Sequence, residues 1–381
     1  MKKICFITTI SITLKSFVLK TAEYIHENTD WDISFICDYD EEFEKSLPDY
    51  IHYIPVKMER GISIKGVMAM FEMIKIFKRE KFDLIQYSTP NASLYAAIAG
   101  KLAKVPVRLY CQWGMIFLSF SGIKRKIFKF IEKTVCSLST HVQPDSKSNL
   151  NFAHEEGLYP KNKGYVIWNG TSCGINLDKF DTSRKKEFRD EIRAKYSLSP
   201  DAFVYGFVGR ITRDKGVNEL IEAYKQISEE NKNTYLLVVG YSEQDGTIQN
   251  DLLEWAQSCE SVIFTGYTAE VEKYLAAMDT YILPSYREGF PMGIIEAQAM
   301  GVPIIVTNIT GIMNGVLDGI TGKVVPVKDA LALKKAMDEI INNPKDVEAY
   351  GKAAMKFATE NFEQKQFLEK VLCDRKSLLN E

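Results

Sequence analysis

Short apolar runs alternate with amphipathic segments along the whole chain. The apolar runs predict buried strands, and the segments between them show the 3.6-residue period of helices. In the first part of the chain the predicted strands are 2–10, 31–37, 82–88, 107–113 and 140–146, and the predicted helices are 16–29, 65–81, 89–105 and 122–138. Apolar strands separated by helices are typical of parallel sheets covered on both faces. The pattern therefore predicts an α/β fold.

The same alternation restarts after a polar, glycine-containing stretch, residues 169–188, which we expect to separate two domains. Beyond it the predicted strands are 202–209, 234–240, 262–266 and 280–285, and the predicted helices are 216–230 and 269–278. Two such runs predict two Rossmann-like domains, residues 1–170 and 171–361, with parallel sheets facing across a cleft.

Length and charge restrict the class of protein. A chain of 381 residues that is 46% hydrophobic exceeds the usual size of one domain. A net charge of −2 argues against a general polyanion binder, so nucleic acid is not an expected partner. Residues 1–170 hold 23 Lys and Arg against 18 Asp and Glu, whereas the remainder holds 25 against 32. The first domain is therefore the basic one.

Cysteine usage and the N-terminus indicate the compartment. The seven cysteines are odd in number, widely spaced and never in a Cys-x-x-Cys pair, which favours free thiols over a zinc site or a disulfide framework. The apolar stretch at the N-terminus contains Thr and Ser and lacks a small-residue cleavage site, which favours a strand over a signal peptide. No run approaches the roughly 20 apolar residues of a spanning helix. We expect a cytoplasmic protein, soluble or peripheral on the membrane face.

The residues suited to chemistry gather in two stretches of the second domain. In "ILPSYREGFPMGIIEAQAMG" a strand leads into a loop with Glu288 and then a helix with Glu296, and Pro291 suits the first helical position. In "VYGFVGRITRDKGVNELIEAY" Arg210 and Lys215 lie in a strand-to-helix loop. Carboxylates suit sugar hydroxyls, and cations with a helix N-terminus suit a diphosphate. Together they predict a nucleotide-sugar site.

The predicted architecture brings the two stretches together. Arg210 and Glu288 each follow a strand, and ligands of open parallel sheets bind in the crevice beyond the carboxyl ends of the strands. Each charge alone is more often a solvated loop residue, but the combination at this spacing is hard to obtain by chance. The sequence contains neither Gly-x-Gly-x-x-Gly nor a Walker phosphate loop, which argues against a dinucleotide dehydrogenase and a P-loop enzyme.

Both stretches resemble the signature of glycosyltransferase family 4, and the chain is similar to that family over nearly its whole length. The resemblance implies the GT-B architecture, a nucleotide-sugar bound mainly by the C-terminal domain, transfer with retention at the anomeric carbon, and no metal or other cofactor. Residues 55–114 resemble the enzymes that build capsule and O-antigen. In this architecture the C-terminal helix, here 362–381, returns to the first domain.

The resemblance also implies residue roles. Arg210 and Lys215 match the diphosphate-binding cations, Glu288 matches the glutamate that contacts the transferred sugar, and Glu296 matches the one that binds the ribose. The remaining matches are Gly289, Phe290 and Met292, in the turn whose backbone approaches the donor, and Gly266, beside the nucleotide base.

One departure concerns the first domain. Many family members carry a His before a glycine at the position matched here by Trp113 and Gly114. None of the four histidines of this chain lies there, so the hydrogen bond from that His to the sugar is not expected. Trp113 could stack on a sugar face or be a buried aromatic at a strand end, and the sequence leaves both open.

Two further motifs allow two interpretations each. Asp38 and Asp40 follow a strand, as in a metal-dependent GT-A transferase, but their acidic surroundings favour a solvated loop. The basic segment 123–133 interleaves Lys and Arg with Ile and Phe. It could lie on an anionic membrane surface, or its apolar stripe could pack on its own sheet.

The sequence thus predicts a retaining, metal-independent glycosyltransferase of surface-polysaccharide assembly. It would move a hexose or N-acetylhexosamine, with UDP as the favoured carrier, to a glycan or lipid-linked oligosaccharide acceptor. Two alternatives stay open: a binding subunit that assists a partner transferase, and a GT-B nucleotide-sugar epimerase. Epimerases of this fold lack the glutamate pair and use histidines that this chain does not offer.

Overall fold

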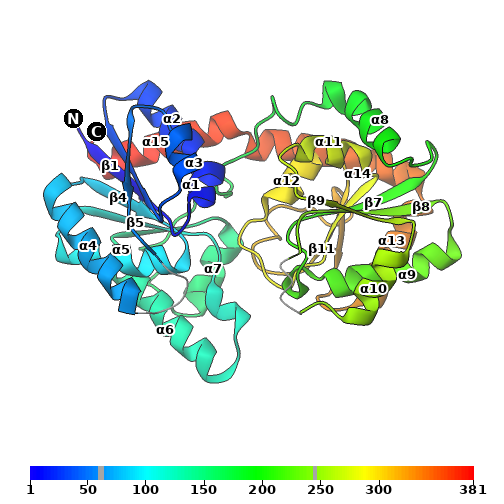
Figure 1. The fold of residues 1–381 in the computed structure, drawn as a ribbon, viewed down its shortest axis with the longest axis horizontal. Helices are drawn as coiled ribbons and strands as arrows, with labels where there is room; N and C mark the ends of the chain where they lie inside the picture. The colour runs from blue at the N-terminus through cyan, green and yellow to red at the C-terminus, as the bar shows by residue number, and fades with distance from the viewer. Residues whose placement is uncertain (59–63, 243–246) are drawn as a thin grey trace. The chain divides into compact units, whose positions relative to one another are not determined.

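The chain folds into two compact units, each built around one parallel sheet (Figure 1). The computed structural model describes residues 1–58, 64–242 and 247–381, so residues 59–63 of the segment compared with capsule enzymes lie outside it. Unit 1 comprises residues 1–173 and 365–381, and unit 2 comprises residues 174–364. The sequence-based boundaries were 170/171 and 361/362.

The sheet of unit 1 has the strand order β3-β2-β1-β4-β5-β6, with every neighbouring pair parallel. Its strands are β1 (Lys3–Ile7), β2 (Asp32–Cys37), β3 (Ile51–Pro55), β4 (Leu84–Tyr87), β5 (Val107–Gln112) and β6 (His141–Pro144). Side chains of β1 enter two separate cores, Ile4 and Phe6 on one face and Cys5 and Ile7 on the other. Burial on both faces explains why this strand is apolar throughout.

The helices of unit 1 are α1 (Ser11–Phe17), α2 (Leu19–Asn28), α3 (Glu41–Ser46), α4 (Ile64–Glu80), α5 (Pro90–Leu102), α6 (Gly122–Leu138), α7 (Lys147–Glu155) and α15 (Gln364–Leu378), with a 3₁₀ turn η1 (Ile116–Ser119). The predicted helix 16–29 is wrong in its bounds, because the structure has two helices separated at Val18.

The acidic segment after β2 is a helix and not the solvated loop that the sequence favoured. Asp40 is the N-cap of α3: its carboxylate accepts the backbone N–H of Phe43 at 3.0 Å and the hydroxyl of Ser11 at 2.5 Å. Capping explains this carboxylate without a metal. Across the described residues, no group of three or more potential metal ligands occurs.

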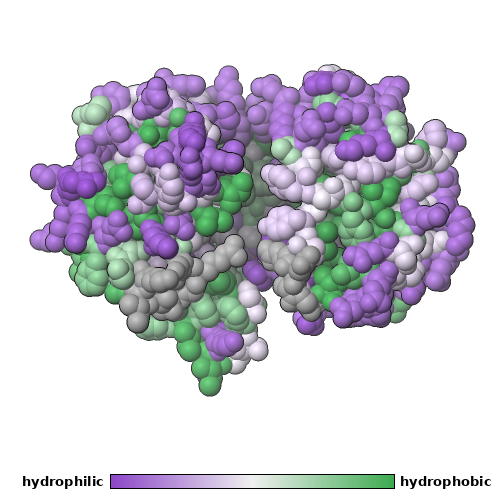
Figure 2. All heavy atoms as spheres, viewed as in Figure 1, coloured by the Kyte–Doolittle hydropathy of each residue, from purple (hydrophilic) through white to green (hydrophobic). Residues whose placement is uncertain are grey.

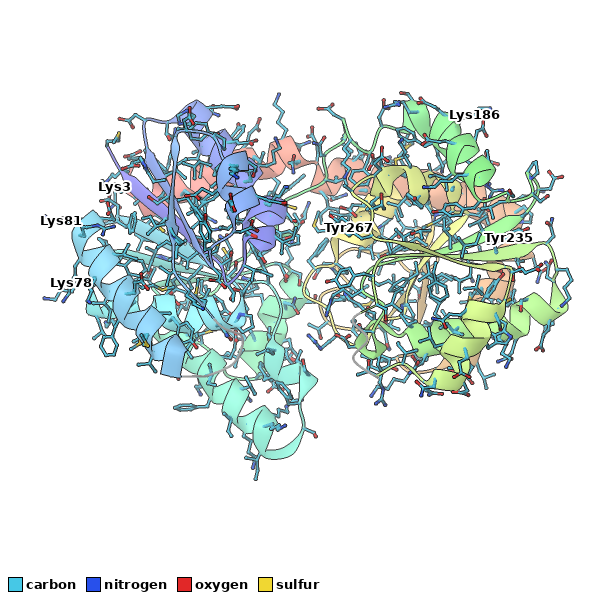
Figure 3. The ribbon with its side chains drawn as sticks, in the orientation of Figure 1. Lys3, Lys78, Lys81, Lys186, Tyr235 and Tyr267 are labelled. Carbon is cyan, nitrogen blue, oxygen red and sulfur yellow. The ribbon has the colours of Figure 1, made fainter. Side chains whose placement is uncertain are left out.

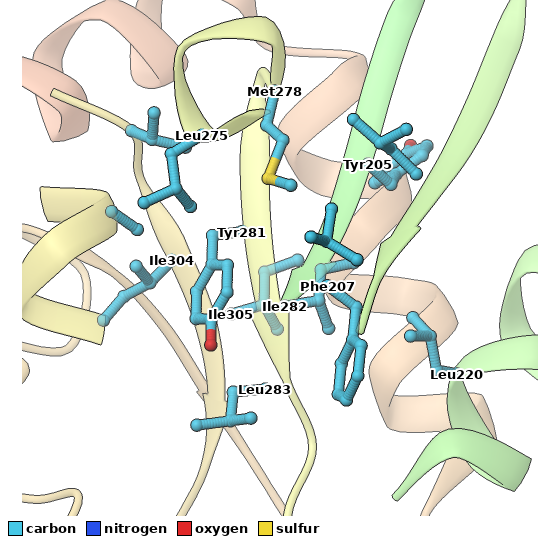
Figure 4. Packing of buried hydrophobic residues seen from close by; sticks show 14 of the residues in the cluster. Tyr205, Phe207, Leu220, Leu275, Met278, Tyr281, Ile282, Leu283, Ile304 and Ile305 are labelled. Atoms are coloured by element: carbon cyan, nitrogen blue, oxygen red, sulfur yellow. The ribbon is translucent and has the colours of Figure 1, made fainter. Parts of the chain in front are cut away.

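Unit 2 repeats the architecture with the strand order β12-β11-β10-β7-β8-β9, again all parallel. The strands are β7 (Phe203–Val208), β8 (Thr234–Val239), β9 (Val262–Gly266), β10 (Thr280–Leu283), β11 (Ile304–Thr307) and β12 (Gly322–Val325). The two six-stranded parallel sheets confirm the predicted α/β fold class. Figure 4 shows the core around β10, where Tyr281, Ile282 and Leu283 are all buried.

The helices of unit 2 are α8 (Lys185–Lys195), α9 (Val217–Glu230), α10 (Asn250–Ser258), α11 (Val271–Ala277), α12 (Met292–Ala299), α13 (Ala330–Ile341) and α14 (Pro344–Phe362), with the 3₁₀ turns η2 (Thr182–Arg184) and η3 (Arg213–Lys215). The separating stretch predicted at 169–188 is too long, because α8 begins inside it and buries Phe188.

A buried arginine attaches α15 to the sheet of unit 1. Arg375 is only 2% exposed, and its guanidinium donates to Gln86 of β4 and to Gln143 of β6, both at 2.9 Å. Asp374 forms an ion pair with the same guanidinium. A buried cation is tolerated only when it is paired and hydrogen-bonded, and here both conditions hold.

A buried carboxylate joins α6 to the end of β5. Glu132 is 6% exposed and accepts hydrogen bonds from Tyr110 at 2.9 Å and from Gln112 at 2.5 Å. Tyr159 in turn donates to Gln112 at 3.2 Å. Burial raises the pKa of Glu132, against the opposing effect of the two donors.

We expect Glu132→Gln to gain stability relative to the parent as the pH rises. The pKa of Glu132 is raised in the folded protein, so its protonated carboxyl contributes fully to the stability of the parent below the unfolded pKa of 4.5. The parent loses this contribution as the pH rises through the folded pKa, whereas the glutamine variant does not titrate. Melting temperatures of parent and variant at pH 5 and pH 8 test this. The melting temperature of the variant minus that of the parent should be larger at pH 8 than at pH 5. The exposed Glu155→Gln is the control, and an unchanged difference for Glu132→Gln contradicts the prediction.

Candidate active site

The loop after β7 approaches the end of β10 very closely. It contains η3 and then Gly216, whose φ is +72°. A Cβ on Gly216 would lie 2.0 Å from the carbonyl oxygen of Pro284, so the position accepts only glycine. The loops from two neighbouring strands are therefore in contact at the carboxyl edge of the sheet. This is the switch point at which ligands of such sheets bind.

The contact brings two of the predicted catalytic residues together. The ammonium of Lys215 lies 2.6 Å from Oε1 of Glu288, and the side chains are only 18% and 10% exposed. The hydroxyl of Ser285 donates to the same oxygen at 2.7 Å. The two donors on one oxygen fix the orientation of the Glu288 carboxylate.

A second ion-pair group lies beside it. Asp214 accepts the guanidinium of Arg287 at 3.0 Å and the hydroxyl of Thr212 at 2.6 Å, and Arg210 lies 3.9 Å away. Burial opposes ionisation of Asp214, but Thr212 and the two arginines outweigh it and lower the pKa of the carboxyl group. Arg210 is 40% exposed, so its guanidinium is accessible to a ligand.

The second predicted glutamate lies on α12, which begins at Met292 and not at Pro291; Pro291 is the N-cap. Burial raises the pKa of Glu296 to about 7, with Lys179 lowering it in part and Glu272 adding to the rise. Burial raises the pKa of Tyr281, and the charges of Glu288 and Glu296 add to the rise. Among the described residues, the carboxylate of Glu296 has no hydrogen-bond or ion-pair partner.

The turn between the two glutamates is packed tightly. The ring of Phe290 is buried against Phe362, with centroids 5.2 Å apart, so its side chain belongs to the core. A Cβ on Gly311 would lie 1.8 Å from the carbonyl oxygen of Gly289, which places the loop after β11 directly against this turn. The approach of the Gly289, Phe290 and Met292 backbone to a donor stays a prediction.

Gly266 lies at the end of β9, at the same edge of the sheet. Its carbonyl accepts the N–H of Gly240, which follows β8, at 2.9 Å. Its φ is +74°, and a Cβ there would meet nothing within 4 Å. Tyr267 follows and is 71% exposed (Figure 3). A glycine with a positive φ and free space around it, next to an exposed aromatic ring, is compatible with binding of a nucleotide base.

Trp113 and Gly114 belong to unit 1, at the end of β5. Trp113 is partly buried, and its ring packs against Phe17 of α1 with centroids 5.7 Å apart. Gly114 has a φ of +104°, a conformation that favours glycine. Whether Trp113 also contacts a sugar stays a prediction.

The outer face of α6 is apolar and exposed. Ile123, Ile127 and Phe130 recur at helical spacing and are 77%, 50% and 72% exposed. Val135 and Cys136, on the opposite face, are buried in the core. Figure 2 shows hydrophobic side chains gathered on the protruding tip that α6 forms. The exposed stripe does not pack on its own sheet.

Comparisons with known proteins bear on the family. Residues 3–146 match the model of the glycosyl transferase 4-like family, and residues 188–357 match that of glycosyl transferases group 1. The chain is 30% identical to the capsular polysaccharide biosynthesis glycosyltransferase CapM of Staphylococcus aureus, covering 89% of this chain and 88% of the relative.

The chain belongs to glycosyltransferase family 4. It is 28% identical to the UDP-Gal:α-D-GlcNAc-diphosphoundecaprenol α-1,3-galactosyltransferase of Escherichia coli over 74% of this chain and 73% of the relative. The fold also matches Anabaena HepE in complex with UDP and glucose, with a TM-score of 0.80 and 19% identity over 99% and 100% of the two chains. The predicted GT-B fold is confirmed, and the protein is a glycosyltransferase.

Within the described part of this glycosyltransferase, no helix is long and apolar enough to cross a membrane. All seven cysteines, each in a described segment, are free.

Sequence reasoning missed the residues that hold the site together. Ser285 and Arg287 lie in "PSYREGFP" and Asp214 lies in "TRDKG", so both motifs contained them. A hydroxyl three residues before Glu288 and a carboxylate between two cations are the signals that could have identified them.

We expect the affinity of this glycosyltransferase for UDP to rise as the pH increases through about 7. At lower pH Glu296 is protonated, and a neutral carboxyl is a weaker acceptor for ribose hydroxyls than a carboxylate. The affinity for UDP should increase about tenfold for each pH unit by which bound UDP lowers the pKa of Glu296. Calorimetric titrations from pH 5.5 to 8.5 measure it.

Because the phosphates of UDP also titrate, the informative quantity is the ratio of parent to Glu296→Gln affinities. That ratio should increase with pH. A constant ratio contradicts a ribose contact by Glu296, and the exposed Glu229→Gln serves as the control.

Proposed function

We propose that the protein is a retaining, metal-independent glycosyltransferase that moves a hexose or N-acetylhexosamine from UDP to a lipid-linked sugar acceptor in surface-polysaccharide assembly. The observation that carries this proposal is the Lys215–Glu288 pair at the switch point of unit 2, with Arg210 and Glu296 at the same strand edge. This arrangement offers cations for a diphosphate and carboxylates for hydroxyls within one site.

The roles follow from where charge develops. When the bond between the anomeric carbon and the β-phosphate oxygen breaks, negative charge grows on the phosphate and positive charge on the sugar. Lys215 and Arg210 are suited to the phosphate, and Glu288 is suited to the sugar. Glu296, which has a raised pKa and no protein partner among the described residues, is suited to the ribose.

The ammonium of Lys215 and the hydroxyl of Ser285 both bind Oε1 of Glu288 and stabilise its negative charge, which makes this carboxylate a weaker nucleophile for double displacement. We therefore propose front-face transfer, in which the acceptor hydroxyl attacks as the diphosphate leaves and the departing phosphate takes the proton. The configuration at the anomeric carbon is retained.

The relatives support the choice of donor and acceptor. The Escherichia coli enzyme is named for UDP-Gal and a diphosphoundecaprenol acceptor, and a Campylobacter jejuni relative, 26% identical, is named for a diphospho-undecaprenol acceptor. An acceptor of this kind is anchored in a membrane.

The outer face of α6 supports a peripheral contact with that membrane. Lys126 and Lys133 flank the exposed stripe of Ile123, Ile127 and Phe130 on one side, and Lys124 flanks it on the other. An apolar stripe between lysines is suited to the boundary between acyl chains and anionic headgroups. We propose that α6 lies at that boundary.

We expect purified protein in EDTA to release UDP from one UDP-sugar in the presence of a lipid-linked acceptor. Glu288→Gln should lower the rate about 10²–10³-fold while UDP still binds, because the contact acts on the transition state. Free UDP, product anomer and UDP affinity are measured together, with Glu229→Gln as the control.

The other outcomes discriminate the alternatives. Normal UDP binding without transfer for any donor and acceptor would support the binding-subunit alternative. An altered sugar nucleotide formed without acceptor would support an epimerase. Transfer that occurs only when Mg²⁺ is added would contradict the proposed metal independence.

We expect replacement of Ile123, Ile127 and Phe130 by Ser to weaken binding to vesicles that contain anionic lipid by about tenfold or more, because each side chain loses a favourable transfer from water. Vesicle co-sedimentation measures it. Leu331→Ser, which removes another exposed apolar side chain, should have no effect. Equal binding of the triple variant and the parent would contradict membrane contact by α6.

A further inference from the structure

A second concave site lies at the amino ends of the strands of unit 2. It has a volume of about 600 Å³, and its walls come from the start of α8, the residues before β10 and β11, and one face of α14. Asp279 directly precedes β10, whereas Glu288 follows the same strand at its other end. We call it the Lys185 cavity, after the cation on its wall.

The ammonium of Lys185 lacks a carboxylate partner within the described structure. Its one hydrogen bond goes to the carbonyl oxygen of Gly301, at 3.0 Å. Asp279 also lines the cavity, but its two oxygens are already taken by Arg189 at 2.7 Å and Arg193 at 2.8 Å. Burial, and secondarily the charge of Arg189, lower the pKa of Lys185 to about 8. A bound anion would supply the missing counter-charge.

The rest of the wall favours an anion with an apolar part. Val347 and Met355 of α14 supply accessible apolar surface beside the amine, whereas Met278, Met300 and Pro303 form the buried floor.

We propose that the Lys185 cavity binds a small organic anion, a carboxylate on a short aliphatic chain, with Lys185 as the charged anchor and Val347 and Met355 of α14 beside the chain. The site is separate from the proposed active site, and the proposal does not depend on the reaction that the protein catalyses. Chain length and charge are both tested by acetate, butyrate, hexanoate and neutral hexanol.

The charged groups around Lys185 set the pH range. Arg189 on the same helix shares the single carboxylate of Asp279 with Arg193, Lys186 pairs with Asp190, and Glu348 and Lys352 of α14 pair with each other at 2.5 Å. Lys185 is therefore the group expected to titrate near neutral pH. Binding of a carboxylate should be strongest below pH 8 and should fade as the pH rises through that value.

The experiment is a ligand-observed NMR titration of the full chain at pH 7 with the four probes. Affinity should increase about fourfold for each added methylene from acetate to hexanoate, the factor expected for burial of a CH₂ group. Hexanol should bind at least tenfold more weakly than hexanoate. Lys185→Met should remove the preference for hexanoate over hexanol.

Lys232→Met is the control, because Lys232 is an exposed lysine of unit 2 that does not line the cavity. It should bind hexanoate like the parent. If Lys185→Met does not fold, the pH titration of the parent gives the same test. No saturable hexanoate binding, equal binding of hexanol, or full affinity in folded Lys185→Met would overturn the proposal.

Discussion

The contact between the loops that follow β7 and β10 determines the candidate active site. Gly216 fits against the carbonyl of Pro284 only because it has no side chain and tolerates a positive φ. That contact brings Lys215 within 2.6 Å of Glu288, where both groups are largely shielded from water. Removing one member of such a pair leaves the other charge uncompensated. The backbone contact at Gly216, which brings the pair together, therefore also determines the electrostatics of the site.

The two motifs sufficed to identify Glu288, Lys215 and Arg210 as neighbours, because parallel strands end at one edge of their sheet. The pairing of Asp214 with Arg287 could not be predicted, since it depends on side-chain positions in two loops 73 residues apart. Phe290 illustrates the limit: its motif position predicts only that its backbone approaches the donor, and the packing of its ring on Phe362 could not be predicted from the motif.

The fold was predictable where strands are apolar throughout and less so elsewhere. The edge strand β3 has a mixed burial pattern, and β11 and β12 were not predicted as separate strands. The acidic α3 has one buried residue, Phe43, so it shows little helical periodicity. In α6 the sequence contains two apolar faces, and only tertiary packing determines which is buried and which stays exposed.

The division of the chain also has a consequence for its synthesis. Unit 1 consists of residues 1–173 and of the final segment, 365–381. Leu372 and Leu379 fill its core, and Arg375 satisfies Gln86 and Gln143 in the sheet. On the ribosome, which completes chains from the N-terminus, unit 2 is fully synthesised before these residues exist. The first unit to emerge is therefore the last that can be completed, and its sheet stays partly uncovered until residues 365–381 have been synthesised.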